Sequence, residues 1–123
     1  MRVLIVDPSK DLAEVVSTAL NRKGFKSYMA HSAQTGISTA DRNKPDAVIL
    51  ELLISNHNGL EFIYEFKSYP DWFDVPIVIY SNISPEELNK APGWEEDMGV
   101  VRHFYKPTTS LEDITNFIAG LKK

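Results

Sequence analysis

Five short, mostly apolar segments recur along this chain and alternate with longer amphipathic stretches. They cover residues 2–6, 26–30, 47–50, 77–80 and 100–105. Continuous apolar runs of this length, rich in β-branched residues, are typical of strands covered on both faces, as in a parallel sheet. The second segment is more polar than the others, which favours a place at the edge of the sheet.

The stretches between these segments carry apolar residues at helical spacing and begin with capping residues. After Ser9, apolar residues return every three or four positions until Gly24, which is a typical helix stop. Further helices are expected from Ser32 to about Asn43, from Asn58 through Ser68 after a turn-rich loop, after Ser84 and after Ser110. This alternation predicts an α/β fold, in which a doubly wound five-stranded parallel sheet carries helices on both faces.

The composition of the chain narrows the classes of function. Its 123 residues fit a single domain over 1–123, and the absence of cysteine excludes structural disulfides and thiolate zinc sites. The formal net charge is -4 and no run of Lys or Arg occurs, so nucleic acid is not expected as a partner. A protein partner or a small cation fits this charge better. No apolar run is long enough to span a membrane and no signal peptide is evident, which predicts a cytoplasmic protein.

Four of the five predicted strands stop at a polar residue. Asp7 follows the first strand, Glu51 the third, Ser81 the fourth and Lys106 the fifth. The carboxyl ends of the strands in an open parallel sheet border the crevice where ligands bind, so these four side chains should share one pocket. Two acids, a hydroxyl and an ammonium suit phosphoryl chemistry. Pro8, directly after Asp7, cannot ligate a metal.

Five short motifs, taken together in their order and spacing, make the chain similar to a known family. They are V-L-I-V-D ending at Asp7, P-D-A-V-I-L-E ending at Glu51, N-G-L-E from Asn58, P-I-V-I-Y-S ending at Ser81 and Y-K-P ending at Pro107. On these motifs the chain resembles the receiver domains of two-component response regulators over essentially its whole length. The resemblance implies a flavodoxin-like fold with strand order 2-1-3-4-5.

The resemblance also assigns roles to individual positions, and two of them depart from the family pattern. The family holds Mg²⁺ with an acidic pair, of which this chain keeps Asp7 but has Pro8 at the second place. The phosphoacceptor position, an aspartate in the family, holds Glu51, and the metal-ligating carbonyl two residues further on belongs to Leu53. We expect a weak or absent Mg²⁺ site at Asp7, Glu51 and Leu53, and no other cofactor, because Mg²⁺ demands a near-octahedral set of oxygen ligands.

The remaining family positions match the pattern more closely. Ser81 stands at the place of the phosphate-sensing hydroxyl and Lys106 at that of the phosphate-neutralising lysine, whose bond to the following Pro107 is typically cis in the family. The aromatic switch position holds His103, which could equally be a plain surface residue of its strand. An ionised Glu51 near the sheet interior needs a partner, and Lys106 is the obvious one, so a purely structural ion pair stays open as an interpretation.

Other histidine and aromatic residues have ordinary structural explanations. His31 and His57 stand alone in turn or loop contexts, where we expect them to be solvated. No metal-ligand spacing links the histidines. Trp72, Phe73 and Trp94 lie in connecting segments and are expected to pack over the edge of the core.

These features together predict a single-domain response regulator that takes part in phosphorelay signalling. The expected variant is atypical, with Glu51 at the phosphoacceptor position. It is not an enzyme, and it signals through contacts with a sensor kinase or a downstream target, as a monomer or weak dimer. Two alternatives stay open: an active Mg²⁺-dependent receiver that is phosphorylated, and a constitutive protein-interaction module with no phosphotransfer role.

Overall fold

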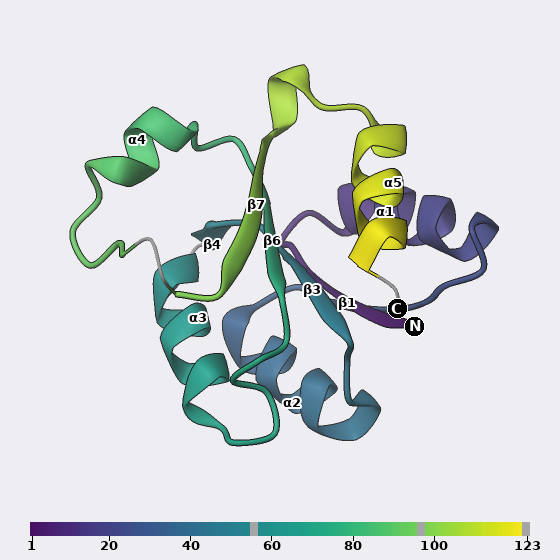
Figure 1. Cartoon of the computed structure of the whole chain (residues 1–123), viewed down its shortest axis with the longest axis horizontal. Helices are drawn as coiled ribbons and strands as arrows, with labels where there is room; N and C mark the ends of the chain where they lie inside the picture. Colours follow the sequence, from purple (N-terminus) through teal and green to yellow (C-terminus); the bar gives the residue numbers. More distant parts are fainter. Residues whose placement is uncertain (55–56, 96–97, 122–123) are drawn as a thin grey trace.

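The main sheet has the topology that the sequence predicts. A computed structural model describes residues 1–54, 57–95 and 98–121 of the chain (Figure 1). Its sheet contains β1 (Arg2–Val6), β2 (Lys26–Ala30), β3 (Ala47–Leu50), β6 (Ile77–Ser81) and β7 (Val100–Tyr105). Neighbouring strands are parallel and their order is β2-β1-β3-β6-β7, which is the predicted order 2-1-3-4-5 when these five strands are counted along the chain. The predicted strand bounds hold, except that the fourth strand extends by one residue to Ser81.

Helices cover both faces of this sheet. They are α1 (Lys10–Arg22), α2 (Ala33–Asn43), α3 (Gly59–Ser68), α4 (Pro85–Asn89) and α5 (Leu111–Leu121). In Figure 1, α1 and α5 lie on one side of the sheet, whereas α2 and α3 lie on the other. The buried apolar residues accordingly form two core clusters, one on each side of the strands. Among the described residues, no helix combines the length and apolarity needed to cross a membrane.

Strand β1 shows how a single strand supplies both core clusters. Val3 and Ile5 belong to the cluster that includes residues of α1 and α5, whereas Leu4 and Val6 belong to the cluster that includes residues of α2 and α3. Successive side chains of a strand point to opposite faces, so a strand that is apolar at every position has to be covered on both sides. Helices α1 and α5 on one side, and α2 and α3 on the other, meet this requirement.

Side-chain caps fix helix starts at positions that the sequence predicts. The Ser9 hydroxyl accepts a hydrogen bond from the Leu12 N–H at 3.2 Å, at the start of α1. Ser84 and Glu87 form a reciprocal capping box at the start of α4. Each cap satisfies a backbone donor that the first helical turn would otherwise leave unpaired, so the helices begin at defined residues.

Three local features differ from the prediction. The segments β4 (Leu53–Ile54) and β5 (His57–Asn58) form a small antiparallel pair within the stretch predicted to be a turn-rich loop. A turn of 3₁₀ helix, η1 (Lys106–Thr108), follows β7. The peptide bond between Lys106 and Pro107 is trans, so the prediction of a cis bond from the resemblance is wrong. Elements of two or three residues are too short to show a hydrophobic period, so tertiary contacts rather than local sequence define them.

Gly59, the first residue of α3, allows this helix to start very close to the segment that follows β3. A Cβ atom added at Gly59 would lie 2.7 Å from the Leu52 Cα atom. The Gly59 N–H also donates to the Leu52 carbonyl at 2.9 Å. Any larger residue at this position would push α3 away. The close contact therefore helps to hold the backbone directly after Glu51.

Candidate functional site

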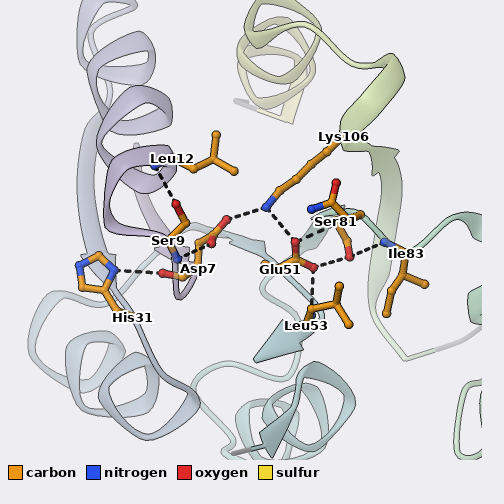
Figure 2. A network of polar contacts seen from close by, with 10 residues as sticks. Asp7, Ser9, Leu12, His31, Glu51, Leu53, Ser81, Ile83 and Lys106 are labelled. Atoms are coloured by element: carbon orange, nitrogen blue, oxygen red, sulfur yellow. Dashed lines mark hydrogen bonds and ion pairs between the residues drawn. The ribbon is translucent and has the colours of Figure 1, made fainter. Parts of the chain in front are cut away.

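The carboxyl ends of the strands bring together the four polar residues singled out in the sequence. Asp7 directly follows β1, Glu51 follows β3, Ser81 ends β6, and Lys106 follows β7. Figure 2 shows their side chains converging from these separate strands. Asp7, Glu51 and Ser81 are buried, at 4%, 4% and 0% relative exposure. Hydrogen bonds join the four side chains into one buried cluster, which is called the pocket below.

Lys106 lies between the two carboxylates of this pocket. Its Nζ atom is 2.9 Å from Asp7 Oδ2 and 2.8 Å from Glu51 Oε1. The same Nζ atom is 5.3 Å from the centroid of the Tyr80 ring, within the range of a cation–π contact. One ammonium group is therefore shared by two buried acids, whereas the sequence predicts a single Glu51–Lys106 pair.

Both carboxylate oxygens of Glu51 are engaged by protein donors. Oε2 accepts the Leu53 N–H at 2.9 Å and the Ser81 hydroxyl. Oε1 accepts from the Asn82 N–H at 3.4 Å in addition to Lys106. A buried ionised carboxylate is costly unless it is paired and hydrogen-bonded, and here it is both. Glu51 is consequently held in one orientation.

The charges of this pocket decide the protonation state of its lysine. Burial acts to lower the pKa of Lys106, but hydrogen bonds and Coulomb attraction from Glu51 and Asp7 together outweigh it, so this pKa lies above its ordinary value. Burial raises the pKa of the neighbouring Tyr80 phenol, and the positive charge of Lys106 only partly opposes this. The lysine is therefore a cation, and the phenol is neutral, at physiological pH.

A hydrogen-bonded path leads from Glu51 to the outer strand of the sheet. The Ser81 hydroxyl, which donates to Glu51, accepts the Ile83 N–H at 3.0 Å. The Ile83 carbonyl in turn accepts a hydrogen bond from His103 Nε2 at 2.7 Å. A carbonyl can only accept, so this imidazole nitrogen carries the proton. The half-buried His103 is thus tied to the pocket, through a backbone link that no side-chain pattern in the sequence could reveal.

His31 is a second imidazole at the edge of the pocket. It is half-buried, and its Nδ1 atom donates to the Asp7 carbonyl at 3.0 Å. The expectation that His31 is simply solvated is therefore wrong, because the end of β2 brings it next to the end of β1. The side chain of His57, for which the same expectation was made, lies outside the described residues.

The aromatic residues of the connecting segments behave differently from one another. Trp72 is buried and stacks on Phe66 with ring centroids 4.9 Å apart, and Trp94 packs partly buried against the same core cluster. Both agree with the expected packing role. Phe73, in contrast, is 65% exposed, so the expectation that it packs over the core is wrong.

The donor set of the pocket does not fit Mg²⁺. The two available carboxylates, Asp7 and Glu51, both point at the Lys106 ammonium, and Pro8 offers no ligand at the next position. Glu51 also uses both oxygens to accept protein hydrogen bonds. A divalent cation needs free oxygen ligands and would be repelled by an ammonium at the same place. In the described part of the chain, no group of three or more His, Cys, Asp or Glu side chains is arranged to hold a metal ion.

Comparison with known proteins defines the class of the chain. The sequence model of the response regulator receiver domain family matches residues 3–118. The chain therefore belongs to this family, as the motifs at the strand ends indicate.

Solved structures share this fold. The chemotaxis response regulator CheY4 of Vibrio cholerae is 20% identical, with a TM-score of 0.84 over 98% of both chains. A sensor protein from Polaromonas sp. JS666 is 22% identical, with a TM-score of 0.83 over 98% of both chains. The N-terminal domain of a response regulator receiver protein from Methanoculleus marisnigri JR1 is 25% identical, with a TM-score of 0.74 over 97% of this chain and 94% of that one.

Proposed function

We propose that this receiver domain signals through protein contacts from a pocket that its own charges hold in one state, without accepting a phosphoryl group. The observation that carries the proposal is the engagement of both Glu51 carboxylate oxygens by protein donors, together with the Lys106 bridge to Asp7. The domain would act in two-component signalling as a partner of a sensor kinase or of a downstream protein.

The geometry of Glu51 supports the absence of phosphoryl transfer. A nucleophilic carboxylate must present a free oxygen in line with the phosphorus atom of the donor. Both oxygens of Glu51 already accept hydrogen bonds, from Ser81 on one side and Lys106 on the other. The side chain is also one methylene longer than the aspartate of the family. Attack would therefore require the network to break first.

Intact-mass measurement tests this proposal. The chain is incubated with acetyl phosphate and Mg²⁺, and Glu51→Gln serves as the matched control. We expect no stoichiometric phosphoryl adduct on either protein. A stoichiometric adduct on the natural chain that disappears in Glu51→Gln would establish the opposite function, that of an active Mg²⁺-dependent receiver.

A gain-of-function variant sharpens this experiment. Replacing Pro8→Asp together with Glu51→Asp supplies the acidic pair and shortens the side chain at the phosphoacceptor position. The double variant should bind Mg²⁺, seen as a metal-dependent change in tryptophan fluorescence or melting temperature. If it folds yet ignores millimolar Mg²⁺, the pocket differs from its family at more than these two positions.

Three further properties stay predictions of the sequence. They are a cytoplasmic location, a monomeric or weakly dimeric state, and the lack of an enzymatic activity. Size-exclusion chromatography with light scattering measures the second directly.

A further inference from the structure

Phe73 is the most exposed large apolar side chain in the described part of the molecule. It is 65% exposed, whereas its neighbour Trp72 is 7% exposed. The Trp72 ring stacks on Phe66 at a centroid distance of 4.9 Å and contacts the Tyr69 ring at 4.8 Å. The loop between α3 and β6 therefore turns one aromatic residue into the core and presents the next one to solvent.

Hydrogen bonds hold this loop in place. The Trp72 N–H donates to the Tyr69 carbonyl, and the Val75 N–H donates to the Trp72 carbonyl, both at 3.0 Å. The Lys67 ammonium donates to the carbonyls of Phe73, at 3.2 Å, and Val75. A partner that covers Phe73 consequently has little backbone freedom left to restrict, which lowers the entropic cost of binding.

A hollow of about 530 Å³ includes both chain neighbours of Phe73 at the amino ends of β3 and β6. The end of α2 and the loop after α3 form it, and both lie at the lower edge of the molecule in Figure 1. Its charged lining residues are Asp41, Lys44, Asp46, Asp71 and Asp74. With four carboxylates and one ammonium, the hollow carries a net negative charge.

The carboxylates of this hollow are only partly compensated within the fold. Asp46 accepts the Arg2 N–H at 2.8 Å, and Asp74 attracts the Lys67 ammonium. The side chains of Asp41 and Asp71 make no hydrogen bond or ion pair with the residues that the structure describes. A cationic group of a partner can therefore pair with these two acids without displacing an internal contact.

We propose that Phe73 and this hollow form a docking surface for an arginine-containing segment of a partner protein. A guanidinium group can stack on an exposed aromatic ring and donate in a fork to a carboxylate. Phe73 supplies the ring, and Asp71 and Asp74, which are close to it in the chain, supply carboxylates.

Charge decides between this partner and a second copy of the chain. The chain has a formal net charge of -4. A symmetric contact through this surface would bring the same four carboxylates of each copy together, so like charges would oppose it. The surface lies at the amino ends of the strands, whereas the Lys106 pocket lies at their carboxyl ends, and the inference does not rest on the proposed function.

Peptide titrations followed by the amide NMR signals of the labelled chain test this proposal. The probes are two amidated peptides of equal charge, one of six arginines and one of six lysines. Both should shift amide signals within residues 41–46 and 71–76. The arginine peptide should bind at least about threefold more tightly, because only its guanidinium groups stack on the ring and fork to carboxylates. Raising the salt concentration should weaken both peptides.

A pair of variants tests the aromatic anchor. Phe73→Ala should weaken binding of the arginine peptide at least about threefold. Val101→Ala removes another exposed apolar side chain, 47% exposed on β7, and should leave binding unchanged. Both changes are made at exposed positions, and melting curves check that the variants stay folded.

A second pair of variants tests the charges. Asp41→Asn with Asp71→Asn should weaken binding of the arginine peptide at least about threefold, because it removes the two acids that the fold leaves without a partner among its described residues. Glu14→Gln with Glu86→Gln removes the same net charge from exposed positions on α1 and α4. This control should change binding by less than about twofold, since exposed charges at a distance are screened.

Four results would overturn the inference. They are shifts centred on another face, equal affinity for the arginine and lysine peptides, equal weakening by the two charge variants, and binding that does not respond to Phe73→Ala. A dimer that depends on Phe73, seen by light scattering without peptide binding, would assign the surface to a second copy instead. A phosphoryl adduct on the natural chain would refute the proposed function and leave these comparisons unaffected.

Discussion

Two partly buried lysines, near opposite ends of the parallel sheet, show how the partners of an ammonium group decide its role. Lys106 lies after the last strand and contacts the carboxylates of Asp7 and Glu51. Lys67, in the last turn of α3, donates instead to the backbone carbonyls of Phe73, at 3.2 Å, and Val75. One lysine is paired with full charges, and the other with peptide dipoles.

The two pKa values move in opposite directions as a result. Burial lowers the pKa of Lys67, and attraction to Asp74 only partly offsets it. Burial acts on Lys106 in the same sense, but two carboxylates outweigh it and raise the pKa. Carbonyl groups can satisfy the N–H donors of an ammonium without compensating its loss of hydration, whereas nearby carboxylates do both. Of the two lysines, Lys106 is therefore the one whose charge is balanced by buried carboxylates.

The largest effect is expected from Lys106→Met. This change leaves Asp7 and Glu51 buried without their shared counter-ion, which should lower the free energy of unfolding by about 3 to 5 kcal/mol. Urea denaturation measures this loss. A loss under about 1 kcal/mol would mean that solvent already compensates the two acids and that the pocket is not held by its charges.

A smaller loss is expected from Gly99→Ala, beside the other lysine. Gly99 has a φ of +83°, and an added Cβ atom would lie 2.5 Å from Lys67 Cε. The left-handed backbone costs a residue with a side chain about 1 kcal/mol or somewhat more, and the lysine must shift as well. In a Lys67→Ala background only the backbone cost should remain. An equal cost in both backgrounds, again by urea denaturation, would show that Lys67 does not pack against Gly99.

Lys67→Met should be milder still, at about 1 kcal/mol. The carbonyl of Phe73 is near solvent and can bind water once the ammonium is gone, so only part of the hydrogen-bond energy is lost. The same denaturation experiment applies. A loss as large as that of Lys106→Met would remove the distinction between charge pairing and carbonyl binding.

The smallest effect is a difference in the dependence of stability on alkaline pH. The pKa of Lys67 is lowered, so between that value and the ordinary 10.5 the unfolded chain binds more protons, and the contribution of Lys67 to stability rises with pH. The pKa of Lys106 is raised, so its contribution is complete below 10.5 and is lost as pH rises through the raised value. The free energy of unfolding of the natural chain, Lys67→Met and Lys106→Met is measured from pH 8 upward. The advantage of the natural chain over Lys67→Met should grow as pH rises, and its advantage over Lys106→Met should shrink. Differences that do not change with pH would contradict both directions.

The sequence predicts the fold better than it predicts these contacts, for physical reasons. The strands were predictable because runs such as 2–6 and 47–50 are apolar at every position, and Ser9 and Ser84 mark helix starts through local hydrogen bonds. Strand order then brought Asp7, Glu51, Ser81 and Lys106 to one edge. The link from Ser81 to His103 runs through the backbone of Ile83 and leaves no signature in residue types. The carbonyl contacts of Lys67 were unpredictable for the same reason.

The bridging position of Lys106 was predictable only in part. A buried Glu51 demands a partner, and that reasoning correctly points to Lys106. That Asp7 shares the same ammonium depends on side-chain reach across three strand ends, which residue spacing does not determine.

The coupling between Glu51 and Lys106 tests the central claim most directly. A double-mutant cycle compares Lys106→Met, Glu51→Met and the double variant by urea denaturation, and Lys67→Met with Glu51→Met gives a control pair that shares no hydrogen bond. If the pocket is held by its own charges, the double variant should lose less stability than the two single variants together, by about 1 to 3 kcal/mol, while the control pair is additive. Additive losses for Glu51 and Lys106 would mean that the two groups do not stabilise each other, and a pocket locked by its own ion network would be ruled out.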